Sequence, residues 1–340
     1  IIDMTKNEKK HKHSHWIDMA SGSMSGALTR AFVAPLDVIK IRLQLQNAPR
    51  NTARNTLQYR GVVQTALKIT HDEGLRALWK GNLIAEVLWV SYAAAQFSLY
   101  HHLLRSLDGP NYTQAETDHK HYSPPTPVAL VAGGVSGILA TALSYPFDTV
   151  RTNIISHHQH TTIPKVARSI LAADGVAGYY KGLSSSLLQI IPQISLQFAT
   201  YEWFRRTYVH FIALRHNQER TELEVSQDAR GQLLCGATSG AVSKFIVLPF
   251  DVVKKRLQVQ PTHVTLGQCV KRMYSEEGWQ AFYKGGVPSI LKAGMAASLS
   301  FTIYEQTKQL IANTLLYMDN KDNNAKATQS ESQPPPTNKS

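Results

Sequence analysis

The charged residues with the most regular spacing in this chain are three aspartates, each placed between a proline and a base. The motif reads Pro-x-Asp-x-x-(Lys/Arg), and its prolines stand at positions 35, 146 and 249, so successive copies are 111 and 103 residues apart. Acid and base three residues apart share one face of a helix. Ion pairs made from such residues can break and re-form, which suits the opening and closing of a passage. The residues are Asp37 with Lys40, Asp148 with Arg151, and Asp251 with Lys254.

A second motif follows each copy and marks the length of a repeat. It consists of an acid and a glycine, followed by an aromatic residue, a lysine and a glycine, and it ends 46, 36 and 36 residues after the proline. Three matches in register lie far above what average composition produces by chance. The copies are Glu73-Gly74 with Trp79-Lys80-Gly81, Asp174-Gly175 with Tyr180-Lys181-Gly182, and Glu277-Gly278 with Tyr283-Lys284-Gly285.

Each repeat predicts a long helix kinked at its proline, a polar loop with a short amphipathic helix, and a second long helix. The expected fold class is an all-α membrane protein with six transmembrane helices in three pseudosymmetric repeats. The first long helices are expected at 17–46, 126–156 and 229–258, the short helices at 59–71, 163–173 and 265–276, and the second long helices at 81–106, 182–209 and 286–314. Repeats then span 16–110, 120–215 and 228–316, between a polar tail of residues 1–15 and a disordered tail of residues 317–340.

Two sets of small and polar residues are expected to support this arrangement. Glycines four apart predict close contacts between membrane helices, namely Gly22 with Gly26, Gly133 with Gly137, and Gly236 with Gly240. Gln44 and Gln258 stand nine residues after their prolines, where an amide can hydrogen-bond beneath an ion pair and brace it. A plain interfacial glutamine is the alternative at each position.

In a threefold bundle the aspartate of one repeat can meet the base of the next. Charges buried in a membrane are costly unless they are paired, so a closed ring of pairs is expected at one end of a central cavity. The alternative is that these charges cap and anchor helix ends without gating. The predicted pairs are Asp37 with Arg151, Asp148 with Lys254, and Asp251 with Lys40.

The composition narrows the possible classes of binding partner but does not choose among them. With 36 Lys and Arg against 24 Asp and Glu, the 340-residue chain has a formal charge of +12, which points to a nucleic acid, an anionic membrane surface or an anionic small substrate. A mean hydropathy of -0.22 is low for a membrane protein, but helices that line a water-filled cavity need only one apolar side. Cys235 and Cys269 are too few for a disulfide framework, so a reducing compartment fits best.

An enzyme is not expected, because no Ser/His/Asp or Cys/His arrangement, phosphate-cradling loop or pair of carboxylates stands in a catalytic context. Neither a cofactor nor a metal is expected, and the polar residues 1–15 hold no apolar segment of a secretory signal. A nucleic-acid-binding helical repeat protein is the alternative of a different class, but it needs bases on exposed faces. Two histidine groups lack companion ligands: His11, His13 and His15, and His157, His158 and His160.

The two motifs together resemble the hallmark of the mitochondrial carrier family over about residues 16–316. The resemblance implies a bundle in the mitochondrial inner membrane that works by alternating access, with the termini on the cytosolic side and the short helices on the matrix side. It makes the ring of aspartates and bases the matrix gate. One departure is Asn153, which stands where repeats 1 and 3 have Arg42 and Arg256.

A second gate is implied at the cytosolic end, where the family carries (Phe/Tyr)-(Asp/Glu)-x-x-(Lys/Arg) on its second long helices. The complete copies are Glu202 with Arg205 and Glu305 with Lys308, and the copy without acid or base is Tyr100-His101-x-x-Leu104. Only Glu202 and Lys308 then form a full pair between repeats, and Arg105 is an alternative partner for Glu305. We therefore expect the cytosolic end to open more readily than the matrix end.

Bases on the cavity side of the helices predict the charge of the ligand. Arg30 and Lys244 precede motif aspartates by seven residues, two helical turns, and their repeat-2 counterpart is Thr141. The resemblance adds contact points seven residues after the glycine of the second motif, which are Leu88 with its neighbour Trp89, Gln189 with its neighbour Ile190, and Lys292. Since no acids stand at the positions of Arg30, Lys244 and Lys292, a multiply charged anion is expected to neutralise them. Snorkelling to the membrane surface is the alternative.

Within the family the resemblance is strongest to the carriers of thiamine pyrophosphate, in segments 35–46, 95–97, 182–184, 196–198, 234–244 and 288–293. It implies entry of thiamine pyrophosphate into the matrix in exchange for another phosphorylated anion. Adenine nucleotides and coenzyme A suit the same bases and remain the alternatives. The expected partners are the anionic substrate and membrane lipid, in particular cardiolipin. The carrier is expected to be a monomer and to bind no nucleic acid.

Overall fold

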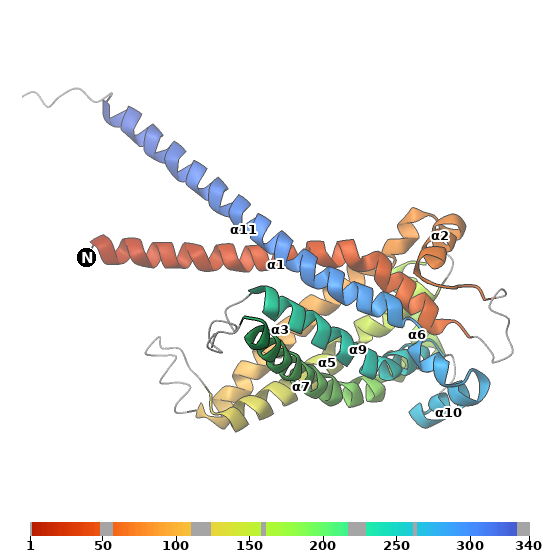
Figure 1. The fold of residues 1–340 in the computed structure, drawn as a ribbon. Coiled ribbons are helices and arrows are strands. Elements are labelled where there is room, and N and C mark those ends of the chain that lie inside the picture. Colours follow the sequence, from red (N-terminus) through yellow and green to blue (C-terminus); the bar gives the residue numbers. More distant parts are fainter. Residues whose placement is uncertain are drawn as a thin grey trace, which may run out of the picture. The chain divides into compact units, whose positions relative to one another are not determined.

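The computed structural model describes residues 2–47, 57–109, 124–157, 161–216, 229–260 and 264–331 (Figure 1). Side chains are described from residue 21 to residue 311, apart from the gaps and a few positions inside helices. Most of the two histidine groups therefore lies outside the described residues, namely the side chains of His11, His13 and His15, and residues His158 and His160.

The secondary structure in the described part of the chain is entirely helical and repeats three times, as the motifs predict. The first long helices are α1 (Ile2–Leu45), α5 (Thr126–Ser156) and α9 (Ala229–Val259). The short helices are α2 (Val62–Glu73), α6 (Ile163–Asp174) and α10 (Leu266–Glu276), each followed by a 3-10 turn, η2 (Leu75–Trp79), η3 (Val176–Tyr180) and η4 (Trp279–Tyr283). The second long helices are α3 (Asn82–Leu107), α7 (Leu183–His216) and α11 (Gly286–Glu331).

Two of these helices run past the predicted ends of the repeats. α1 begins at Ile2 and α11 ends at Glu331, so α11 covers part of the segment for which composition predicts disorder. Lys, Glu, Gln and Ala are good helix formers, and adding residues to an existing helix is far easier than starting one. The division of the chain into repeats and tails remains a prediction.

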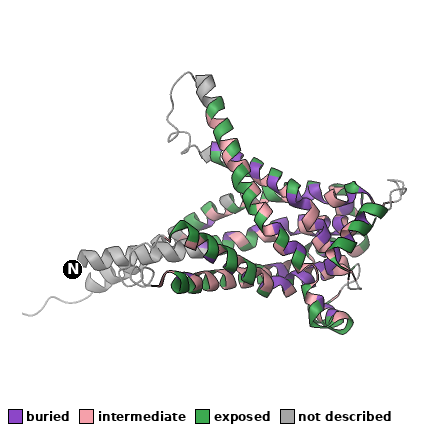
Figure 2. Cartoon of the chain, turned by 90° about the horizontal axis from the view of Figure 1, so that it is seen from below, coloured by how far each residue is buried: buried purple, intermediate pink, exposed green. Residues whose placement is uncertain are grey.

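The chain forms two compact units, which are described separately. The central unit comprises residues 33–294 and contains all three proline motifs and all three short helices. The terminal unit comprises residues 1–32 and 295–340, and within it the hydroxyl of Ser25 donates to the carbonyl of Ser300 at 2.7 Å. In the central unit, buried residues gather where the long helices approach the short ones (Figure 2).

The final glycine of each second motif joins one repeat to the next inside the central unit. Gly81, Gly182 and Gly285 have φ angles of 75°, 82° and 75°, a region that favours glycine. A Cβ atom at Gly182 would lie 3.0 Å from the carbonyl oxygen of Lys254, and one at Gly285 would lie 3.1 Å from that of Lys40. The second long helix of each repeat therefore starts directly against the first long helix of the next repeat, which brings the three proline motifs together.

Small residues other than the predicted glycines occupy the buried face of the first long helices. A Cβ atom added at Gly133, Gly137, Gly236 or Gly240 meets no heavy atom within 4 Å among the described residues, so the expected glycine contacts are not formed there. The buried stripe begins one position earlier, at 14, 10 and 6 residues before each proline, and a shift of one residue turns the stripe by about 100°. Its members are Ser21, Ser25 and Thr29; Ala132, Ser136 and Ala140; and Cys235, Ser239 and Ser243. Cys235 thus serves as one more small packing residue.

Large apolar side chains cover the outside of the long helices. They include Val90 and Phe97 on α3, Leu130 and Leu143 on α5, and Ile191, Phe198 and Trp203 on α7, all more than half exposed. Extensive exposed apolar surface of this kind is typical of contact with lipid. Among the described residues, three stretches are long and apolar enough to cross a membrane: Leu75–Leu107, Thr126–Ser156 and Cys235–Val259. In α7 the amides of Gln189, Gln193 and Gln197 recur every four residues, and such a polar stripe lowers the average hydropathy of a helix.

Candidate functional site

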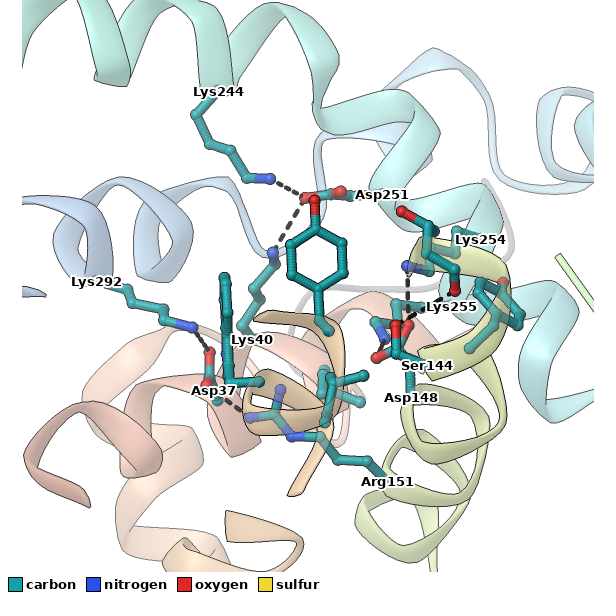
Figure 3. Close-up of a pocket in the computed structure, with 16 residues that line it drawn as sticks. Asp37, Lys40, Ser144, Asp148, Arg151, Lys244, Asp251, Lys254, Lys255 and Lys292 are labelled. Atoms are coloured by element: carbon teal, nitrogen blue, oxygen red, sulfur yellow. Dashed lines mark hydrogen bonds and ion pairs between the residues drawn. The ribbon is translucent and has the colours of Figure 1, made fainter. Parts of the chain in front are cut away.

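Three ion pairs join the repeats in a ring, in the pairing that the sequence predicts (Figure 3). Arg151 lies 2.7 Å from Asp37, Lys254 lies 2.8 Å from Asp148, and Lys40 lies 3.1 Å from Asp251. Each pair connects the first long helices of two different repeats. All of these side chains are largely buried, so each charge depends on its partner in the ring.

Each aspartate of the ring also contacts a second base. Lys292 lies 2.5 Å from Asp37, Lys244 lies 2.6 Å from Asp251, and Lys255 lies 2.9 Å from Asp148. Figure 3 shows Lys244 of α9 pointing toward Asp251 and Lys292 of α11 pointing toward Asp37. Lys255 comes from α9, next to Lys254. The ring therefore holds six bases on three carboxylates.

This arrangement corrects one sequence prediction. Lys244 and Lys292 have no acid at the corresponding helix positions, and they were therefore expected to face the cavity without a carboxylate partner. The structure pairs both with motif aspartates, because the flexible four-carbon stem of a lysine carries its ammonium group far from its own backbone. Both still line the cavity, with 24% and 37% of their side chains exposed.

One of the two predicted glutamine braces is present. Gln258 donates from its amide nitrogen to Asp148 at 3.0 Å, and its amide oxygen accepts from Thr152 and Lys255 at 2.8 and 3.0 Å. Gln44 is fully buried, and neither its amide nitrogen nor its amide oxygen has a hydrogen-bond partner among the described residues. Its side chain packs instead against Gly285, where a Cβ atom would lie 2.9 Å from its Cγ. The prediction that Gln44 braces a pair is therefore not met in this structure.

A cavity of about 420 Å³ opens above the ring inside the central unit. Its lining includes all three motif aspartates together with six bases, which leaves an excess of three formal positive charges. The bases are Lys40, Arg151, Lys244, Lys254, Lys255 and Lys292. A site with this charge favours a multiply charged anion, since bases held in a largely buried place are stabilised by every negative charge that enters.

Leu88, Trp89, Tyr92 and Thr141 form the uncharged wall of the cavity. The rings of Trp89 and Tyr92 meet edge to face, with centroids 6.2 Å apart and planes 80° apart. Aromatic faces of this kind can stack on a flat heterocycle or attract its positive charge. The hydroxyl of Thr141 already donates to the carbonyl of Gly137 at 2.7 Å.

Two of the predicted binding residues do not line this cavity, and a third belongs to the unit that is described separately. Gln189 is buried and donates to Asp251 at 2.6 Å, so its amide supports the ring and does not line the cavity. Its neighbour Ile190 is also absent from the lining. Arg30 belongs to the terminal unit, where its guanidinium nitrogen lies 3.3 Å from the place of a Cβ at Gly26.

Lys255, Ser144 and Tyr145 line the cavity although the sequence prediction omits them. The signal for Lys255 was present in the run Lys254-Lys255-Arg256, where repeats 1 and 2 have only one or two bases. Ser144 and Tyr145 precede Pro146 and look like ordinary helix residues. The ring of Tyr145 lies 5.1 Å below the ammonium group of Lys254, and its hydroxyl donates to the carbonyl of Lys181 at 3.0 Å.

The lysine of each second motif hydrogen-bonds to the carboxyl end of the first long helix of the next repeat. Lys80, Lys181 and Lys284 donate to the carbonyls of His157, Gln260 and Gln46, at 3.2, 2.9 and 2.9 Å. These carbonyls stand eleven residues after the motif prolines, at the carboxyl ends of the helices, where the helix dipole favours a cation. A second set of contacts between repeats thus lies beside the ring.

The acid of each second motif holds this lysine in place. Asp174 accepts from Lys181 at 2.6 Å, and Glu277 accepts from both Lys284 and Arg256. Burial raises the pKa of Glu277, but the hydrogen bonds from Arg256 and Lys284 outweigh it and hold the pKa below the ordinary value. In repeat 2, Asn153 replaces the arginine and donates to the carbonyl of Gln258 at 2.9 Å, so the departure from the family pattern keeps a contact between repeats.

At the other end of the molecule, the acid of α7 is bound within its own helix. Glu202 accepts from Arg205 at 3.1 Å and from Arg206 at 2.9 Å. Arg205 thus has a partner that the sequence prediction did not assign to it. Glu305 and Lys308 belong to the terminal unit, in which the ammonium group of Lys308 lies 5.7 Å from the ring of Tyr304.

Comparison with known proteins places this geometry in a family. The sequence matches the family described as "Mitochondrial carrier protein" over residues 11–110, 122–211 and 226–315. It is 35% identical over 313 residues to "Mitochondrial thiamine diphosphate carrier 1" of Arabidopsis thaliana, covering 85% of this chain and 92% of that protein. It is 33% identical to "Mitochondrial thiamine diphosphate carrier 2" of Zea mays, with 87% and 94% covered, and 31% identical to "Mitochondrial thiamine pyrophosphate carrier" of Homo sapiens, with 84% and 89% covered.

The three matched segments coincide with the three structural repeats and cover most of the chain. The resemblance stated from the two motifs is thereby confirmed. The protein belongs to the mitochondrial carrier family, and it is a multi-pass solute transporter of the mitochondrial inner membrane, with six transmembrane helices and its short helices on the matrix side.

Proposed function

We propose that this carrier moves thiamine pyrophosphate into the matrix by alternating access, in exchange for another phosphorylated anion. The observation that carries the proposal is the excess of three positive charges in a cavity that also has an aromatic wall. A pyrophosphate group supplies several negative charges for the bases, and the thiamine portion supplies flat rings for Trp89 and Tyr92. The relatives with the word thiamine in their names support the same substrate.

Lys244 and Lys292 are the proposed anchors of the pyrophosphate group. Both line the cavity, and both end on an aspartate of the ring. A phosphate oxygen that takes either ammonium group leaves the aspartate with its motif base and one fewer cation. Arg30 is proposed as a third anchor and Leu88 as a contact for the thiamine rings.

The ring itself is proposed as the matrix gate. A ligand shifts a conformational equilibrium only by binding its two states differently. Here the difference comes from Lys244 and Lys292, which contact Asp251 and Asp37 in the closed ring and phosphate in the liganded carrier. Each motif aspartate, with the bases that contact it, is called a corner of the ring. Binding therefore weakens the corners at Asp37 and Asp251. The amides of Gln258 and Gln189 hydrogen-bond to Asp148 and Asp251, two of the carboxylates that have to separate from their bases.

The cytosolic gate is proposed to use Glu202, Arg205, Glu305 and Lys308. Repeat 1 has neither acid nor base at the two motif positions, whereas the matrix end has three complete pairs and the second-motif lysines. We propose that the cytosolic end opens more readily for this reason. The cavity and the matrix gate come from one chain, which supports a monomeric carrier.

A membrane lipid with phosphate groups, cardiolipin in particular, is proposed for a second pocket of the central unit. This pocket, of about 420 Å³, lies between the start of α2 and the start of α11 and is lined by Arg60, Gly61, Lys284 and Gly286. Helix starts with free amide groups and nearby bases are suited to phosphate.

Exchange in liposomes tests the proposed substrate. Purified protein is reconstituted into liposomes loaded with thiamine pyrophosphate, and entry of the labelled compound is followed while thiamine, thiamine monophosphate, ADP or coenzyme A is added outside. The proposal predicts exchange that unlabelled thiamine pyrophosphate blocks best, thiamine monophosphate blocks weakly and thiamine does not block. Exchange of ADP or coenzyme A without any entry of thiamine pyrophosphate would overturn the substrate and leave the family untouched.

A further inference from the structure

Lys255 is a base at a position where the other two repeats have none. Counted from the motif prolines, its counterparts in repeats 1 and 2 are Ile41 and Thr152. Its ammonium group contacts Asp148 at 2.9 Å, Thr152 at 2.8 Å and Gln258 at 3.0 Å. An ammonium group has three protons to donate. All three are directed at acceptors, so Lys255 is fully engaged in the ring.

The two other second bases are placed differently. Lys244 and Lys292 reach the ring from the cavity, each contacts one aspartate, and 24% and 37% of their side chains are exposed, against 12% for Lys255. An anion in the cavity can therefore take Lys244 and Lys292 with little loss of other contacts. The same anion would have to break three hydrogen bonds to take Lys255.

The corner of the ring at Asp148 is accordingly the most strongly held of the three. One carboxylate oxygen of Asp148 accepts from Lys254 and Gln258, and the other accepts from Lys255. Lys254 is held further by the hydroxyl of Ser186 at 3.1 Å. These contacts connect α9 to α5 through several charged hydrogen bonds, which are the stronger kind.

We infer that Lys255 is a positioning residue that keeps the contact between repeats 2 and 3 closed while the substrate loosens the other two corners. The inference rests on the proposed matrix gate. It makes the opening of the gate asymmetric: the corners at Asp37 and Asp251 yield first, because their second bases can leave for the anion, and the corner at Asp148 yields last.

Labelling of a single cysteine from the matrix side tests this role without any substrate. Ser144 lines the cavity and differs from cysteine by one atom, so Ser144→Cys is the reporter. Cys235→Ala and Cys269→Ala remove the two native cysteines of the chain. Inside-out inner-membrane vesicles expose the matrix side to a membrane-impermeant maleimide, which reaches the reporter only when the ring opens.

In this background, Lys255→Ile introduces the repeat-1 residue and removes all three hydrogen bonds of the ammonium group. It is expected to speed labelling at least about tenfold, the change that corresponds to losing a single hydrogen bond to a charged group. Lys255→Thr, the repeat-2 residue, is the second variant if the first does not insert into the membrane, and it is expected to speed labelling as well. Lys255→Arg is expected to keep the slow rate. The matched control is Lys271→Ile, which removes an exposed base on α10 and should leave the rate unchanged.

Equal labelling rates with Lys255 and with Ile or Thr in its place would overturn the inference, even if those variants melt at a lower temperature. Because no substrate is present, the result does not depend on thiamine pyrophosphate. If thiamine pyrophosphate is not exchanged in liposomes but Lys255→Ile is labelled faster, the proposed substrate is wrong and the role of Lys255 stands.

Discussion

At the residue scale, sharing of each motif aspartate between two bases explains how nine charges coexist inside a membrane protein. A buried ion pair gains little unless further hydrogen bonds satisfy both partners. Here Asp251 contacts Lys40, Lys244 and Gln189, so neither of its carboxylate oxygens lacks a partner. The three bases in excess of the carboxylates give the cavity a positive charge, which favours the entry of anions.

The aromatic wall gives a prediction that separates ring recognition from charge recognition. Trp89→Ala should weaken the apparent affinity for thiamine pyrophosphate about 3- to 10-fold, since stacking on a flat ring is worth about 0.5–1.5 kcal/mol. Competition by inorganic pyrophosphate, which has no ring, should stay the same. Trp203→Ala on the exposed side of α7 is the control. Equal losses for both compounds in Trp89→Ala would show that Trp89 does not contact the thiamine rings.

At the element scale, the first long helices pack through a stripe of small residues that lies one position away from the glycines. α5 packs against α3, and Ser136 in the stripe of α5 is completely buried while Gly137 faces open space. Glycine at such an open helix position contributes nothing to packing. The stripe sets how closely α5 can approach its neighbours, and through that the position of Asp148.

Ser136 and Gly137 provide a matched pair for testing this packing. Ser136→Leu should destabilise the detergent-purified protein by about 1–3 kcal/mol, because a close-packed contact has no space for extra methylene groups. Gly137→Leu should change the stability little or raise it, because it relieves the cost of glycine in a helix. Thermal unfolding, followed with a thiol-reactive dye or by tryptophan fluorescence, gives the midpoint temperature of each variant. A larger fall in the unfolding temperature for Gly137→Leu than for Ser136→Leu would show that the helices make their close contact at the glycines instead.

The sequence predicted the long and short helices and the three pairs of the ring, because motif spacing and repeat symmetry determine them. It did not predict the partners of Lys244 and Lys292, since the end of a long side chain is placed by neighbours on other helices. It assigned Gln44 and Gln258 the same role by symmetry, yet Gln258 meets Asp148 while Gln44 packs on Gly285. The repeats are alike in backbone and differ where single side chains differ, as at Ile41, Thr152 and Lys255.

At the scale of the whole molecule, two sets of contacts join the three repeats to one another. The ring of aspartates is one set, and the second-motif lysines on the helix ends are the other. Both sets follow the same cyclic order, so movement of one repeat strains contacts with both of its neighbours. In the proposed mechanism, the anion loosens the ring from inside the cavity.

Uptake of labelled thiamine pyrophosphate by liposomes that contain the protein and internal thiamine pyrophosphate tests this account most directly, with Lys292→Ala as the variant and Lys271→Ala as the control. Both variants are first shown to resist carbonate extraction, as an integral membrane protein does. The account predicts uptake by the wild-type protein and by Lys271→Ala, and uptake at least 100-fold slower by Lys292→Ala, roughly the effect of losing a charged contact in a buried site. Full uptake by Lys292→Ala, or no uptake by the wild-type protein, would contradict it.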